Sequence, residues 1–144
     1  MQPHRVSYIT GLDWLKYSLI QYYLRVTMLE IHTSFYPYQL ALYRRSHVEL
    51  RLKIKNTGNE KTLVSFKLEL PGKISLDKSG FKGMHSEKLG EMQPRQAIEK
   101  RFEIHPRPLA QHGSVAIAIT ATEHYNNYEF TMKDYKKKVE LVIS

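Results

Sequence analysis

The chain has 144 residues, 42% of them hydrophobic, which is enough for one domain with its own core. It contains no cysteine, which excludes a disulfide framework and a zinc site with cysteine ligands. Its 22 Lys and Arg residues exceed its 14 Asp and Glu residues, and the resulting formal net charge of +8 should attract anionic partners.

The first 27 residues differ in pattern from the rest of the chain. Their apolar and aromatic side chains recur at alternating spacings of three and four, as on one face of an amphipathic helix: Tyr8, Leu12, Leu15, Leu19, Tyr22 and Val26. In a second interpretation, Met28 is the true initiator and the upstream stretch is an over-long start. Both interpretations treat residues 1–27 as an N-terminal extension and residues 28–144 as the folded domain.

The extension carries no pattern of membrane insertion or export. Asp13, Lys16 and Arg25 interrupt its apolar residues, so we expect no transmembrane segment. It also lacks the basic start, apolar centre and small-residue cleavage site of a signal peptide. This favours the cytoplasm over the cell surface as the location of the protein.

From Met28 onward the apolar residues recur with a period of two, which is typical of half-buried strands. We expect strands over residues 28–36, 47–55, 62–70, 97–104, 115–122 and 135–143. Residues 73–90 are expected to be irregular, with at most a short strand over 86–89, and Lys100 interrupts the inward set of its strand. The pattern predicts an all-β, immunoglobulin-like antiparallel β-sandwich of about seven strands.

Turn-forming residues separate these strands in a recognisable order. They are Asn56, Gly58, Pro71, Pro94, Pro106, Ala110 and Gly113. With these residues, most of the segment from Val48 to Ile143 resembles the immunoglobulin-like modules of the CARDB type and those appended to many prokaryotic surface proteins and glycosidases. That resemblance implies adhesion or accessory binding without catalysis. The glycine that the family has after Pro94 is Arg95 here.

The sequence shows no constellation typical of an enzyme. It lacks the HExxH spacing of zinc hydrolases and the GxSxG setting of a nucleophilic serine, and most acids alternate with Lys or Arg on strand exteriors. His105 and His112 flank a proline-rich turn, and we interpret them as exposed loop histidines rather than metal ligands. We therefore expect no catalytic residue, no cofactor and no metal.

A loop rich in Tyr and Asn is the first candidate binding surface. It comprises His124, Tyr125, Asn126, Asn127 and Tyr128, between the last two strands. Tyr and Asn together supply contact area and adaptable hydrogen bonds, so a binding loop is one interpretation. The other is a hairpin whose tyrosines cover the end of the core.

A group of basic residues is the second candidate surface. Its members are Arg51, Lys53, Lys55, Lys136, Lys137 and Lys138. Such a face could follow an anionic glycan or a nucleic acid, whereas lysines on an edge strand also prevent aggregation. Our leading hypothesis is a non-catalytic module that binds a protein partner or a second copy of itself. Recognition of an anionic polymer is the alternative.

Overall fold

The computed structural model describes residues 29–44 and 46–144. The amphipathic helix and the alternative start considered for residues 1–27 lie outside this range. Nine strands are present in the described chain: β1 (Leu29–Tyr36), β2 (Gln39–Leu40), β3 (Val48–Asn56), β4 (Thr62–Glu69), β5 (Ile74–Ser75), β6 (Met84–Met92), β7 (Ala97–Pro106), β8 (Gly113–His124) and β9 (Thr131–Ile143). A 3-10 turn, η2 (Leu42–Arg44), precedes β3.

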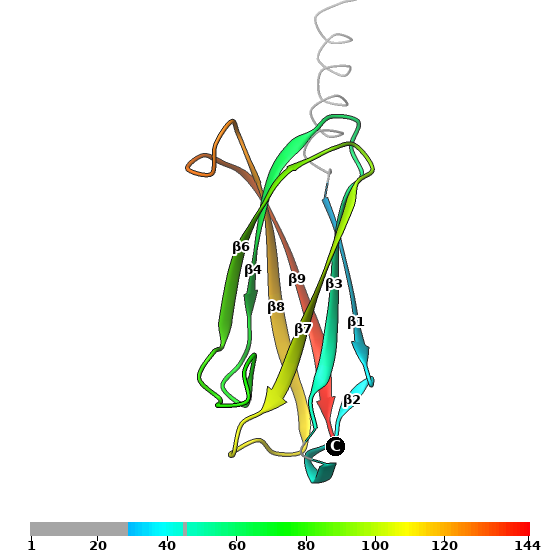
Figure 1. The fold of residues 1–144 in the computed structure, drawn as a ribbon, viewed down its shortest axis with the longest axis vertical. Coiled ribbons are helices and arrows are strands. Elements are labelled where there is room, and N and C mark those ends of the chain that lie inside the picture. Colours follow the sequence, from blue (N-terminus) through cyan, green and yellow to red (C-terminus); the bar gives the residue numbers. More distant parts are fainter. Residues whose placement is uncertain (1–28, 45) are drawn as a thin grey trace, which may run out of the picture.

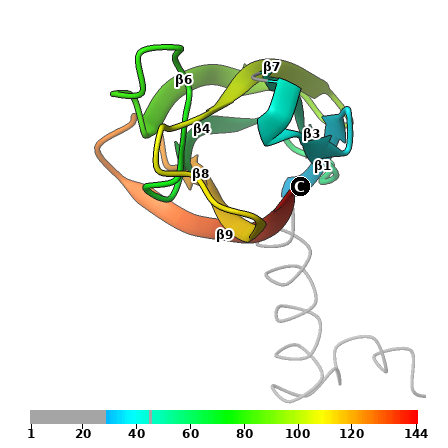
Figure 2. The ribbon, with the colours of Figure 1, turned by 90° about the horizontal axis from the view of Figure 1, so that it is seen from below.

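The strands form two sheets that pack face to face (Figures 1 and 2). One sheet has the order β1-β3-β7-β5 and the other the order β2-β9-β8-β4-β6. The pairs are antiparallel, except that the short β2 runs parallel to the end of β9. This confirms the predicted immunoglobulin-like β-sandwich. No helix within residues 29–44 and 46–144 has the length and hydropathy needed to cross a bilayer.

The core lies between the sheets and consists of the side chains that alternate inward along each strand. In β3, Val48, Leu50, Leu52 and Ile54 are buried while their neighbours are more exposed, as the period of two predicts. Opposite them, Ile117 and other inward residues of β8 close the core. Burial of each large aliphatic side chain contributes roughly 1.5–3 kcal/mol to stability.

The region expected to be irregular contains more strand than its sequence suggests. Besides the short β5, it forms the nine-residue β6, which pairs with β4. The inward positions of β6 include His85 and Glu87, so the strand lacks the apolar alternation from which strands are recognised. These polar side chains are tolerated because β6 is the last strand of its sheet.

Lys100, which breaks the apolar alternation of β7, forms an ion pair at this edge of the sandwich. Its Nζ lies 2.6 Å from Oε2 of Glu87, and Nε2 of His85 lies 3.1 Å from Oε1 of the same carboxylate. Hydrogen bonding from Lys100 and then from His85 lowers the pKa of Glu87. The pair joins β6 of one sheet to β7 of the other, and its partial exposure limits its contribution to about 1 kcal/mol.

The turn after β3 shows why its asparagine is required. The Asn56 side chain accepts a hydrogen bond from the Gly58 amide (3.0 Å) and donates to the carbonyl oxygens of Glu60 (2.9 Å) and Met92 (3.1 Å). The Arg95 amide donates to the Asn56 carbonyl oxygen, and Arg95 has a φ of +66°. Left-handed backbone favours glycine. This conformation accounts for the glycine expected after Pro94.

Candidate functional site

The hairpin between β8 and β9 carries the Tyr- and Asn-rich loop and projects from one end of the sandwich (orange in Figure 1). The Tyr125 amide donates to the Phe130 carbonyl oxygen (2.9 Å), which closes the loop. Asn126 has a φ of +64°, a conformation that asparagine tolerates better than most residues. The Asn127 carboxamide oxygen accepts from the Glu129 amide (2.9 Å). Local hydrogen bonds thus hold the loop in one shape.

Two of the predicted loop residues anchor the hairpin to neighbouring strands. Nε2 of His124, which is buried, lies 2.6 Å from the Ser65 hydroxyl on β4. The ring of the half-buried Tyr128 contacts the His124 ring edge-on, with centroids 5.1 Å apart. The Tyr128 hydroxyl accepts from the Gly90 amide on β6 (2.9 Å), and Lys88 Nζ lies 4.9 Å from its ring centroid. These contacts give His124 and Tyr128 a structural role.

The hairpin presents three large apolar side chains to solvent. Tyr125 is 60% exposed, Phe130 57% and Met132 51%. Of these, only Tyr125 belongs to the set predicted from sequence. Phe130 and Met132 lay within the expected connection between the last two strands but were not among its candidate binding residues. The loop is also shorter than expected, since β9 begins at Thr131 whereas the sequence pattern placed its start at 135.

A hollow of about 380 Å³ beside the hairpin is lined by three carboxylates, those of Glu60, Glu91 and Glu123, and by Lys61, Tyr125 and Met132. Lys61 Nζ lies 3.7 Å from Glu91 Oε2, so one positive charge already offsets part of the negative charge there. Glu123 is 1% exposed, and its Oε2 accepts from the Tyr135 hydroxyl (3.2 Å). Its Oε1 has no hydrogen-bond partner in the described chain.

Burial raises the pKa of Glu123, with hydrogen bonds from Thr62 and Tyr135 acting in the opposite direction. The sequence contains a signal for this site, although Glu123 was not among the predicted site residues. The inward series of β8 runs through Ile117, Ile119 and Ala121, and the period of two places Glu123 next in that series.

The predicted basic residues of β3 lie on the outer face of their sheet among acidic neighbours. Arg51 Nε donates to Glu49 Oε1 (3.1 Å), and Arg101 Nε lies 3.5 Å from the same oxygen. Lys53 is directly opposite Glu99 on β7. The face therefore has mixed charge rather than a continuous positive stripe.

The three consecutive lysines of β9 belong to the other sheet and do not share one surface. Lys136 and Lys138 are exposed on the outer face. Lys137 points the other way, and its Nζ donates to the carbonyl oxygen of Ile31 on β1 (3.0 Å). It thereby joins β9 of one sheet to β1, an edge strand of the other. The predicted basic residues are thus distributed over both sheets.

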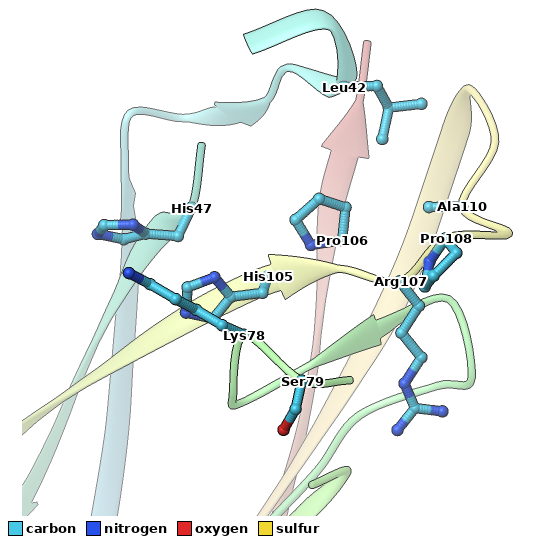
Figure 3. Close-up of a pocket in the computed structure, with 9 residues that line it drawn as sticks. All are labelled: Leu42, His47, Lys78, Ser79, His105, Pro106, Arg107, Pro108 and Ala110. Carbon is cyan, nitrogen blue, oxygen red and sulfur yellow. The ribbon is translucent and has the colours of Figure 1, made fainter. Parts of the chain in front are cut away.

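Side chains of the types that bind metals gather where β7 ends, at the opposite end of the sandwich from the hairpin (Figure 1), and Figure 3 shows two of them, His47 and His105. His47 Nε2 is 3.4 Å from Glu103 Oε1, and His105 Nε2 is 3.2 Å from Glu103 Oε2. They border a hollow of about 850 Å³ that Lys78 and Arg107 also line. His105 was expected to be an exposed loop histidine near His112, but it is buried on β7, with His47 and Glu103 beside it.

Comparisons with known proteins bear on the fold. Neither protein-family models nor curated proteins match the sequence. Among solved structures, the chain is similar to the CARDB domain of the PF1109 protein from Pyrococcus furiosus, described in complex with di-metal ions. The TM-score is 0.52 and the identity 13%, over 81% of this chain and 86% of that one.

A second similar structure is the alkylpurine DNA glycosylase AlkC of Pseudomonas fluorescens, bound to DNA containing an abasic site analogue. Its TM-score is 0.40 at 13% identity, over 81% of this chain but only 30% of that one. The likeness to the CARDB domain shows the fold expected from the turn residues.

Proposed function

We propose that this domain is a non-catalytic binding module that contacts a protein partner through the β8–β9 hairpin. The observation that carries the proposal is the exposure of Tyr125, Phe130 and Met132 on one hydrogen-bonded hairpin. Aromatic side chains and methionine are enriched where proteins bind one another. A rigid loop also loses little conformational entropy on binding.

The hollow beside the hairpin indicates the chemistry of that partner. A Lys or Arg side chain entering the hollow would place its charge near Glu123, whose Oε1 has no partner in the described chain. A cation there would favour the ionised carboxylate that burial disfavours. Tyr125 and Met132 on the rim would contact the apolar part of the partner. The preferred ligand is therefore a protein segment with a basic residue beside an apolar one.

Recognition of an anionic polymer receives less support from the surface. The basic residues of β3 are interleaved with Glu49 and Glu99, which would repel phosphate or sulfate groups. Lys137 is engaged with the backbone of β1. The protein partner could also be a second copy of this chain bound through the hairpin. The test below separates such self-association from binding to a different protein.

The test compares the full chain with the double variant Tyr125→Ala/Phe130→Ala. The matched control is Tyr38→Ala, which removes a tyrosine that is 76% exposed but lies outside the hairpin. Sedimentation velocity measures self-association, a pull-down measures binding to other proteins, and elution from heparin over a salt gradient measures polymer binding. We expect the double variant to lose the protein contact and Tyr38→Ala to keep it.

Two results would count against the proposal. One is a protein contact that survives in the double variant. The other is heparin binding as the only association, weakening steeply with salt because it depends on release of counterions. Circular dichroism of each variant shows whether it remains folded.

A further inference from the structure

The pairing register of β3 and β7 brings His47, Glu103 and His105 together. Val48 on β3 is paired with Ile104 on β7, so the residues just beyond this pair, His47 and His105, come side by side. Their ring centroids are 5.2 Å apart. Glu103 is two residues before His105 on the same strand, so both side chains leave the same face of the sheet.

The distances within the cluster suit a metal ion. Donor atoms bound at about 2.1 Å to a tetrahedral ion lie roughly 3.4 Å from one another. The two histidine nitrogens lie 3.4 Å and 3.2 Å from the two Glu103 oxygens. All three ligand atoms fall within 4.8 Å of one another. The side chains could therefore coordinate an ion after small rotations, without movement of the strands.

The cluster has one buried side chain, His105, and two side chains that are open to solvent, His47 and Glu103. The His105 side chain is 9% exposed, whereas His47 is 45% and Glu103 56% exposed. An ion could enter from solvent and keep a water molecule as its fourth ligand. The nearby Arg107 guanidinium is engaged with the Gly72 carbonyl oxygen (3.2 Å). Lys78, which lines the same hollow, opposes a divalent charge and should make binding weaker than in a closed structural site.

We propose that His47, Glu103 and His105 form a binding site for a divalent transition-metal ion of the Zn²⁺ type. Two imidazoles and one carboxylate suit Zn²⁺, Cu²⁺ or Ni²⁺, whereas Mg²⁺ and Ca²⁺ prefer oxygen ligands throughout. The site lies at the other end of the sandwich from the hairpin, so it is independent of the proposed protein contact.

The test is calorimetric titration of the tag-free full chain with Zn²⁺, after removal of metal with a chelator. The ligand variants are His47→Ala and Glu103→Gln, both at exposed positions where the fold should tolerate them. The matched control is His32→Ala, which removes a histidine of the same sheet face that pairs with Glu30 (3.1 Å) in a similar surface contact.

We expect one ion per chain for the wild type and for His32→Ala, and excess Mg²⁺ should not displace it. Each ligand variant should bind at least about ten-fold more weakly, since loss of even an outer-shell partner weakens metal binding by that amount. Three results would overturn the assignment: no saturable binding by the wild type, ligand variants that bind as tightly as the wild type, or an equal loss in His32→Ala. Displacement by Mg²⁺ would overturn the assigned class of metal.

Discussion

Tyr128 offers the sharpest test of how the hairpin is held. Tyr128→Ala removes an edge contact with His124 worth about 0.5–1.5 kcal/mol. It also removes a hydrogen bond from the Gly90 amide worth about 1 kcal/mol and a cation–π contact with Lys88 worth about 0.5 kcal/mol. Together these predict a loss of about 2–3 kcal/mol, whereas Tyr125→Ala, at an exposed site, should cost under about 0.5 kcal/mol.

Urea denaturation followed by circular dichroism measures both variants, and an unchanged m-value keeps the comparison valid. Tyr128→Phe is the internal control: it retains the ring and loses the hydroxyl, so it should cost about 1 kcal/mol. Equal stability losses for Tyr125→Ala and Tyr128→Ala, or no loss for the latter, would refute the assignment of Tyr128 to structure and Tyr125 to the free surface.

Three further predictions concern the core, the buried carboxyl and the strained turn. Leu50→Ala, at a fully buried site, should lower the free energy of unfolding by about 2–5 kcal/mol in the same assay. Lys53→Ala, on the outer face, should lower it by less than about 1 kcal/mol. Equal losses would show that the strand register is wrong. Burial raises the pKa of Glu123, so the stability of the wild type relative to Glu123→Gln should be highest at low pH and fall as the pH rises above the ordinary value of 4.5. Unfolding free energies of the two proteins that change in parallel from pH 4 to 8 would contradict this. Arg95→Gly should raise stability by about 1 kcal/mol because it relieves a φ of +66°, and a lowered melting temperature would argue against strain there.

All six strands expected from the alternation of apolar residues are present. In β3 and β4 the alternation places residues such as Leu50 and Phe66 in the core. The segment of β6 was expected to be largely irregular because His85 and Glu87 occupy inward positions at the sheet edge. Alternating hydropathy reveals a strand only where the inward side chains pack against other apolar groups. At the edge of a sheet, inward side chains can instead be polar if ion pairs satisfy them.

The candidate sites could be predicted only in part. The composition of the Tyr-rich loop identified it as a candidate, but the sequence does not distinguish Tyr125 from Tyr128. In the structure, Tyr125 is exposed and Tyr128 is bonded to a neighbouring strand. The difference arises from Gly90, whose amide meets the Tyr128 hydroxyl across the sheet. His47 carried no signal in the sequence, because its partner His105 lies on a strand far along the chain.

Some properties of this protein follow from local sequence alone: the strand class, the inward and outward sides of the apolar strands, and the turns at Asn56 and Pro94. They depend on backbone preference and on residues two positions apart, which every segment carries within itself. Only the tertiary structure decided that Lys100 would meet Glu87, or that Lys137 would bind the backbone of β1. Such contacts depend on strand order and register, which all the strands determine together, so no single segment contains the information.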